Sequence, residues 1–158
     1  MQGKLQEIEA NDPEGLALSR ACFAPYRHCY RVIHGAKPKQ VDIQSSWRFF
    51  GYFYEGALVG RVEVKLSVKC LSISALAVDA SYRRLGVANE ILSELALAFP
   101  NAEHFSLWCV EETGNKAIFE SMGFKAKAYE KSMIFELLDG GMATEWQMVK
   151  RINRREHE

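Results

Sequence analysis

The sequence predicts an α/β (α+β) fold built on one mixed β-sheet, with the element order βααβββαβαββ. Apolar residues recur with helical spacing over 88–99, between two strand-like apolar runs at 71–78 and 105–110. The turn dipeptides Glu55-Gly56 and Asp139-Gly140 each separate two alternating runs, as in β-hairpins. Because hairpins join some neighbouring strands and a helix joins others, the sheet should contain both antiparallel and parallel pairs.

The N-terminal segment carries a short strand and two helix signals. Alternating apolar and polar residues over 4–9 predict the strand. Asp12 and Pro13 supply an N-cap acceptor and a proline suited to a first helical turn, so a helix is expected to follow them. Helix-like spacing over 23–33 predicts a second, less regular helix, and the polar stretch 35–44 predicts a loop.

The remaining elements follow from the same two periodicities. The expected strands and helices are a hairpin of strands 47–54 and 58–65, a strand 71–78, a helix 88–99 ended by Pro100, a strand 105–110, a short helix 115–122 stopped by Gly123, and strands 128–138 and 142–152. We find no repeat or domain boundary, so residues 1–158 are expected to form a single domain.

Composition and charge exclude several classes of protein. Hydrophobic residues make up 48% of the 158 residues, which is typical of an ordinary globular domain and excludes disorder. Twenty basic residues balance twenty acidic ones, so no overall basic field attracts nucleic acid or anionic lipid. No apolar run approaches the ~20 residues needed to cross a bilayer, and the polar start lacks a signal peptide, which predicts a cytoplasmic location. The four cysteines form no Cys-x-x-Cys pair, so we expect reduced thiols and no metal.

The loop between the strand 71–78 and the helix 88–99 has the features of an anion site. The first N–H groups of a helix lack partners within it, and the helix dipole adds partial positive charge there. Gly86 and Ala88 permit a close approach of the backbone to a phosphate, and Arg83 and Arg84 add charge-assisted donors. The loop therefore suits a diphosphate.

This loop resembles the pyrophosphate-binding motif of the GNAT superfamily of acetyl-coenzyme A-dependent N-acetyltransferases. The family pattern Gln/Arg-x-x-Gly-x-Gly/Ala is matched by the six residues Arg83-Arg84-Leu85-Gly86-Val87-Ala88. A second family block is matched by a strand ending at Val110, a helix that begins at Asn115, and the closing pair Gly123-Phe124. The resemblance covers nearly the whole chain and implies helices on both faces of a mixed sheet.

The resemblance also implies where acetyl-coenzyme A lies. In this family the cofactor occupies a gap where two parallel central strands splay apart, here 71–78 and 105–110. Backbone groups of Leu76, Ala77 and Val78 would pair with the pantetheine arm, and a freed N–H of Ala77 or Val78 would serve as the oxyanion donor. The pyrophosphate would bind Arg83, Arg84, Leu85, Gly86, Val87 and Ala88, while Asn115 and Phe119 would border the pantetheine and the acetyl group.

The chain departs from its relatives at the residues that move protons. Phe119 stands where many members have a tyrosine acid, which leaves Tyr129, Cys109 or unassisted departure of the thiolate. Ser72 stands where the histone-acetylating branch has its glutamate base. Three other carboxylates could act through a water, although each is also an ordinary surface charge: Glu63, Glu111 and Glu112.

These observations predict an N-acetyltransferase that transfers an acetyl group from acetyl-coenzyme A directly to a primary amine of a small molecule or a protein. The alternative is a coenzyme A-binding module with weak or no catalysis, which the replacements at Phe119 and Ser72 favour. The expected partner is an amine acceptor, with no nucleic acid and no membrane, and an exposed final hairpin would allow a homodimer.

Overall fold

The computed structural model describes residues 2–33 and 47–154 of the chain. Eight strands form one sheet in the order β1-β3-β4-β5-β6-β8-β7-β2, in which the pair β5–β6 is parallel and all others are antiparallel. The predicted mixed sheet is confirmed. The loop expected over 35–44 lies outside the described residues.

Strands hold more of the described residues than helices do, and the helices lie between them in sequence. The strands are β1 (Lys4–Ile8), β2 (Tyr30–Val32), β3 (Arg48–Tyr54), β4 (Ala57–Ser67), β5 (Cys70–Val78), β6 (His104–Val110), β7 (Lys125–Leu137) and β8 (Met142–Arg151). The helices are α1 (Pro13–Phe23), α2 (Val87–Ala98) and α3 (Asn115–Ser121), with 3-10 turns η1 (Ala24–His28), η2 (Ala80–Tyr82) and η3 (Glu111–Thr113).

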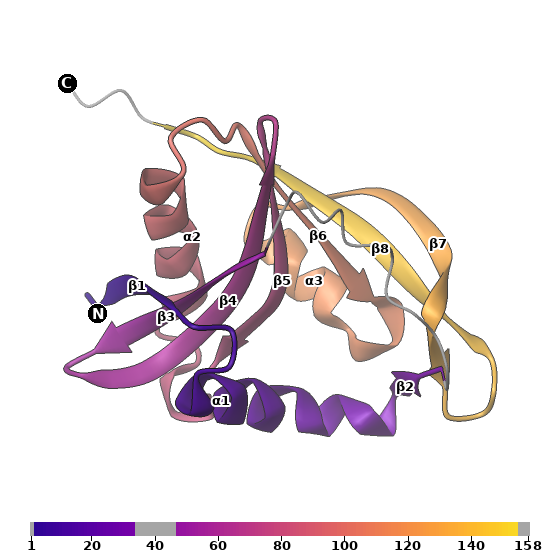
Figure 1. Ribbon diagram of the computed structural model, residues 1–158. Coiled ribbons are helices and arrows are strands. Elements are labelled where there is room, and N and C mark those ends of the chain that lie inside the picture. Colours follow the sequence, from indigo (N-terminus) through magenta and orange to yellow (C-terminus); the bar gives the residue numbers. More distant parts are fainter. Residues whose placement is uncertain (1, 34–46, 155–158) are drawn as a thin grey trace.

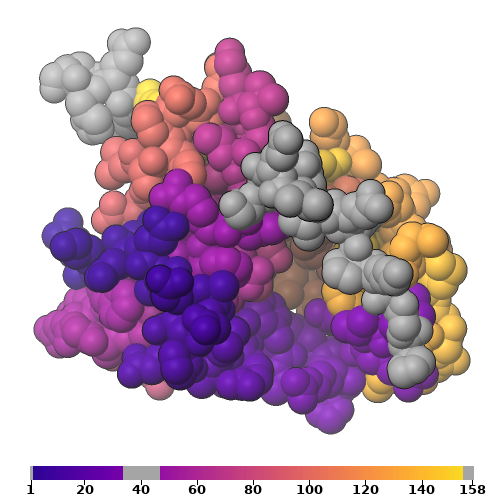
Figure 2. Space-filling view, viewed as in Figure 1, coloured from indigo at the N-terminus to yellow at the C-terminus, as the bar shows by residue number. Residues whose placement is uncertain are grey.

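Helices cover both faces of the sheet (Figure 1). On one face Leu18 and Cys22 of α1 pack over Ala77. On the other face α2 places Ile91 and Leu95, both fully buried, in the main core, and α3 packs against the same core. Successive residues of a strand point to opposite faces, so β4 contributes to both layers. Figure 2 shows α1 and β2 running along one side of the molecule towards the β7–β8 ribbon.

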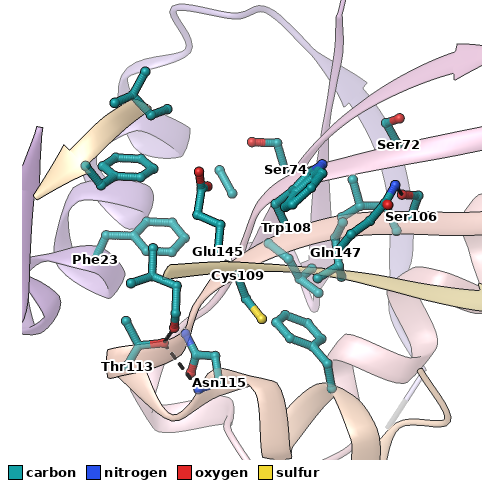
Figure 3. A pocket seen from close by; sticks show the side chains of 18 of the residues that line it. Phe23, Ser72, Ser74, Ser106, Trp108, Cys109, Thr113, Asn115, Glu145 and Gln147 are labelled. Atoms are coloured by element: carbon teal, nitrogen blue, oxygen red, sulfur yellow. Dashed lines mark hydrogen bonds between the residues drawn. The ribbon is translucent and has the colours of Figure 1, made fainter. Parts of the chain in front are cut away.

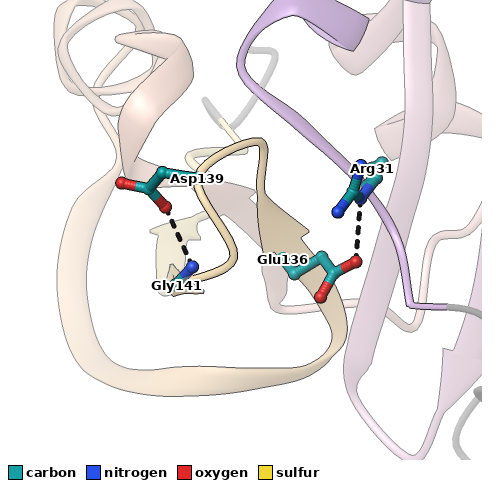
Figure 4. A network of polar contacts seen from close by, with 4 residues as sticks. All are labelled: Arg31, Glu136, Asp139 and Gly141. Carbon is teal, nitrogen blue, oxygen red and sulfur yellow. Dashed lines mark hydrogen bonds and ion pairs between the residues drawn. The ribbon is translucent and has the colours of Figure 1, made fainter.

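Local signals account for the start of α1 and for both hairpin turns. The Asp12 carboxylate accepts the N–H of Gly15 at 2.9 Å, which satisfies one of the free donors of the first turn. Glu55 and Gly56 both have positive φ, as a type I′ turn requires. In the second turn Asp139 accepts the N–H of Gly141 at 2.9 Å (Figure 4).

The second helix expected over 23–33 is only partly correct. The chain makes the 3-10 turn η1 and then the strand β2, which pairs with the end of β7. Arg31 Nε donates to Glu136 at 2.8 Å (Figure 4). The Tyr30 and Phe135 rings meet edge to face, with 4.9 Å between their centroids. This strand exists because of a partner more than 100 residues away, which the local spacing could not reveal.

The central strands separate halfway along their length. β5 and β6 pair only from Cys70–His104 to Ile73–Leu107, and beyond that point the register shows no pairing between them. The divergence is visible in Figure 1. The two strands therefore leave a gap in the middle of the described sheet, as the resemblance implies.

Candidate functional site

A cavity of about 720 Å³ fills the gap between β5 and β6. Ser74 and Trp108 line it from the face of the sheet that carries α1, whereas Cys109 and Phe119 line it from the α3 face. Since residues of both faces line one cavity, it passes through the sheet at the point where the strands diverge (Figure 3).

The edge of β5 that borders the gap is irregular. Ala75 has a φ of +51°, and two residues of β5, Ala75 and Leu76, oppose one residue of β4 at a register shift. This bulge bends the strand and disrupts the regular ladder next to the cavity. Ala75 and Leu76 both line the cavity.

The register beyond the bulge separates the two expected oxyanion donors. Asp79 N–H donates to Val59 O at 2.8 Å. Because hydrogen-bonded pairs alternate along an antiparallel ladder, the backbone N–H and carbonyl of Ala77 point towards Arg61 of β4. The backbone groups of Val78 point away from β4, since its carbonyl accepts from Cys22 Sγ and from Arg83 Nε, both at 3.2 Å. The N–H of a strand residue points to the same side as its carbonyl, which directs the Val78 N–H towards the gap.

The loop before α2 contains two left-handed residues. Gly86 has a φ of +81° and is the N-cap of α2 without a side-chain cap, and Arg84 is also left-handed at +65°. The first bond within the helix runs from Glu90 N to Gly86 O at 3.0 Å, so Val87, Ala88 and Asn89 precede the first bonded N–H. Left-handed residues that turn successive N–H groups inward form anion-binding nests. The geometry of the loop fits a diphosphate.

Aromatic side chains from the N-terminal segment and from β7 form one wall of the cavity. They are Phe23, Tyr26, Tyr30 and Phe135. Tyr26 Oη donates to Asn115 Oδ1 at 3.2 Å and so connects η1 to the start of α3. Burial, followed by the proximity of Tyr26, Cys29 and Glu145, raises the pKa of Tyr30, which keeps its hydroxyl protonated near neutral pH.

The start of α3 is held next to the cavity by a short network. Thr113 Oγ1 donates to Val110 O at 2.7 Å and accepts the N–H of Asn115 at 3.2 Å. Phe119 lines the cavity and packs against Phe124 at 5.7 Å between ring centroids. The structure thus brings Asn115 and Phe119 to the gap, as expected.

The three carboxylates proposed from sequence as bases are engaged elsewhere. Glu63 accepts from the buried Arg61 guanidinium at 2.7 Å. Glu111 accepts from the Trp146 indole at 3.2 Å, and Glu112 accepts from the Thr144 N–H at 3.2 Å. These three side chains lie outside the cavity lining.

The two proton donors proposed from sequence lie in different places. Tyr129 is 66% exposed, packs on Trp146 and lies outside the cavity lining, so its position does not suit a donor to the thiol. Cys109 lines the cavity, and burial raises the pKa of its thiol to about 11. Its thiol therefore stays protonated at neutral pH.

Sequence reasoning missed the polar residues that β8 brings to the cavity. Glu145 and Gln147 line it because they lie opposite Val110 and Trp108 of β6 in the β6–β8 register. The only signal in the sequence is the alternation of residues 144–147, which places Glu145 and Gln147 on one face of a strand. Gln147 Nε2 donates to Ser106 Oγ at 3.5 Å.

Comparison with solved structures shows a shared fold at low sequence identity. A GNAT family acetyltransferase from Elizabethkingia anophelis with acetyl-CoA bound matches with a TM-score of 0.63 and 12% identity, covering 95% of this chain and 98% of that one. An aminoglycoside 6'-N-acetyltransferase complexed with coenzyme A matches with a TM-score of 0.64 and 13% identity, covering 98% and 99%.

A third structure with this fold is the ribosomal-protein-S18-alanine N-acetyltransferase from Escherichia coli, with a TM-score of 0.60, 15% identity and coverage of 99% and 98%. A search of curated proteins finds no match. The family model described as acetyltransferase (GNAT) domain matches residues 14–135. The chain therefore belongs to the GNAT acetyltransferase family.

Proposed function

We propose that the protein is an N-acetyltransferase that transfers the acetyl group of acetyl-coenzyme A directly to a primary amine. The observation that carries this proposal is the cavity that passes between β5 and β6, with the left-handed loop before α2 following the end of β5. A cavity open to both faces allows two substrates to meet from opposite sides of the sheet.

The binding of acetyl-coenzyme A rests on backbone groups and a few side chains. The N–H groups of 84–88 would hold the pyrophosphate, helped by the exposed Arg84 guanidinium. Leu76 and Val78 would present backbone groups to the pantetheine arm, since the register of β5 turns these groups away from β4. Asn115 and Phe119, which line the cavity, would border the arm from the side of α3.

The reaction needs a neutral amine, a stabilised oxyanion and a leaving thiolate. The amine nitrogen attacks the thioester carbon, a C–N bond forms and the C–S bond breaks. The Val78 N–H is our candidate for the oxyanion donor, because the register of β5 turns it away from β4. A preorganised backbone donor needs no side chain, which fits a strand edge lined by serine and alanine.

The leaving thiolate has candidate proton donors although Phe119 replaces the usual tyrosine. Tyr26, Tyr30 and Cys109 all line the cavity, and the raised pKa values of Tyr30 and Cys109 keep both groups protonated. A thiolate is also a weak enough base to leave without help.

The lining of the cavity favours an acceptor with an apolar or aromatic body. Phe23, Tyr26, Tyr30 and Phe135 offer ring surfaces, and the Trp108 ring lies across the cavity from Phe23 (Figure 3). Aromatic rings contribute apolar contact area and also attract a cationic amine through their faces.

A second candidate function is a coenzyme A-binding module with weak catalysis. Phe119 and Ser72 favour it, because Phe119 stands where many members of the family have a tyrosine acid, and Ser72 stands where the histone-acetylating branch has its glutamate base. The two functions share the cofactor site and differ only in turnover.

Two measurements on the wild-type protein test the proposal. Calorimetric titration with acetyl-coenzyme A tests the cofactor site. Amine-dependent release of coenzyme A thiol, followed with 2-phenylethylamine, spermidine and an alanine-terminal tripeptide, tests the transfer. Binding with turnover of at least one amine supports the enzyme, binding without turnover supports the module, and absence of binding contradicts both.

A further inference from the structure

We propose that Glu145 is the general base of the acetyl transfer and that its carboxylate receives the ammonium group of the acceptor. This inference rests on the proposed function and adds the residue that the sequence did not identify. The histone-acetylating branch has its glutamate base at the position of Ser72 on β5, whereas Glu145 lies on β8, on the other side of β6.

The register places Glu145 at the open part of the gap. β8 pairs with β6 throughout, and Glu145 lies opposite Val110, three residues beyond the last pairing of β6 with β5 at Leu107. The side chain is half-buried and lines the cavity. Figure 3 shows it reaching into the cavity between Phe23 and Trp108.

The charges around the cavity point to the same residue. Among the described residues that line it, Glu145 is the sole carboxylate, and Lys65 is the sole ammonium. Lys65 lies opposite Ser72, in the part of β5 that is still paired with β6, so it is remote from Val110 along the strands. The carboxylates of Glu63 and Glu111 are held by Arg61 and Trp146, outside the lining.

Three ionisable side chains lie close to Glu145, and none of the three is a cation. Tyr30 lies close by on β2, Cys109 on β6, and Glu130 lies directly opposite on β7. The structure shows no basic side chain paired with Glu145 within 2–33 and 47–154. An acceptor ammonium would therefore give the Glu145 carboxylate the ion-pair partner that the described residues do not supply, next to aromatic faces that also attract cations.

The proton balance is simple. Glu145 accepts one proton from the acceptor ammonium, directly or through one water, which gives a neutral amine and a carboxylic acid. The amine attacks the thioester carbon, and its second proton goes to the departing sulfur. The products are the N-acetyl amine and the coenzyme A thiol, and the proton on Glu145 is released to solvent.

The test compares three variants at the same backbone position with one matched control. Glu145→Gln keeps the size and removes the charge, Glu145→Asp keeps the charge, and Glu145→Ala leaves room for an added carboxylate. Glu130→Gln is the control, because it removes the same charge from the cross-strand neighbour, whose side chain is exposed and lies outside the lining. All are assayed with the panel amine that the wild type acetylates fastest.

We expect Glu145→Gln to lower kcat by about 10²-fold or more, with the acetyl-coenzyme A affinity and the melting temperature unchanged. Glu145→Asp should retain part of the activity, Glu130→Gln should stay close to wild type, and added formate should restore turnover to Glu145→Ala but not to Glu145→Gln. Wild-type kcat in Glu145→Gln would overturn this inference and leave the proposed function standing. A wild-type protein that binds acetyl-coenzyme A and acetylates no amine would overturn both.

Discussion

Substitutions of Gly86 test the cofactor site sharply, because their effect on folding stability can be separated from their effect on cofactor affinity. Its φ of +81° is strained for any residue with a Cβ, yet a Cβ built there meets no atom within 4 Å. Gly86→Gln and Gly86→Glu should therefore destabilise the fold only through the left-handed backbone, by about 1–2 kcal/mol. For a chain of this length that lowers the melting temperature by roughly 2–8 °C.

The two substitutions differ in charge and should differ in affinity. At about 4 Å in water, two unit charges repel by about 1 kcal/mol. Against the two charges of a diphosphate, the Gly86→Glu carboxylate should add about 2 kcal/mol to the loss seen in Gly86→Gln, or about 30-fold in Kd. Gly140→Glu is the matched control, since Gly140 has a φ of +94° and equally open space but lies in the β7–β8 turn.

The assay is calorimetric titration of each folded variant with acetyl-coenzyme A. The expected order of affinity is wild type and Gly140→Glu, then Gly86→Gln, then Gly86→Glu. A folded Gly86→Glu protein that binds acetyl-coenzyme A as tightly as Gly86→Gln would show that the pyrophosphate does not lie at this loop.

Three further predictions concern stability. Arg154 donates to three carbonyls around the end of α2, at 2.6, 3.0 and 2.8 Å. Arg154→Ala should therefore lower the free energy of unfolding by about 1–3 kcal/mol in urea titration and leave the acetyl-coenzyme A affinity unchanged. An unaltered urea midpoint would refute this stabilising role of Arg154. Burial and the hydrogen bond to Glu90 raise the pKa of Tyr52 from 10.0 to about 12, so the folded state favours the protonated phenol. The protonated phenol therefore contributes to folding stability in full below about pH 10, and this contribution is lost between pH 10 and 12. Tyr52→Phe should make the unfolding free energy less dependent on pH in that range, and an equally steep decline in both proteins would contradict the assignment. Glu63→Gln leaves the buried Arg61 without its ion pair and should destabilise the protein by about 1–3 kcal/mol, whereas kcat should be retained. A folded Glu63→Gln variant without turnover would instead indicate that Glu63 is the general base.

The sequence predicts the elements whose signals are local. The helical spacing around Ile91 and Leu95, the Asp12 cap and the Glu55-Gly56 turn each depend on residues within a few positions of one another, and the structure confirms all three. The strand β2 was missed because its three residues depend on β7, and the bulge at Ala75 was missed because nothing in an alanine indicates a left-handed backbone.

Side-chain roles were harder to predict than backbone elements. Glu63 and Glu111 have the residue type of a base, but Arg61 and Trp146 hold them away from the cavity. Glu145 reaches the cavity through the pairing of β8 with β6, a contact that no spacing along the chain encodes. Residue type therefore restricts the candidates, and the register of the sheet selects among them.

The position of acetyl-coenzyme A between the splayed strands and at the start of α2 can be tested by amide hydrogen exchange with and without saturating acetyl-coenzyme A. We expect slower exchange in 74–78 and 83–89 when the cofactor is bound, with no comparable change in the β7–β8 turn around Gly140. Slowed exchange elsewhere in the chain, with 74–78 and 83–89 unaffected, would contradict it.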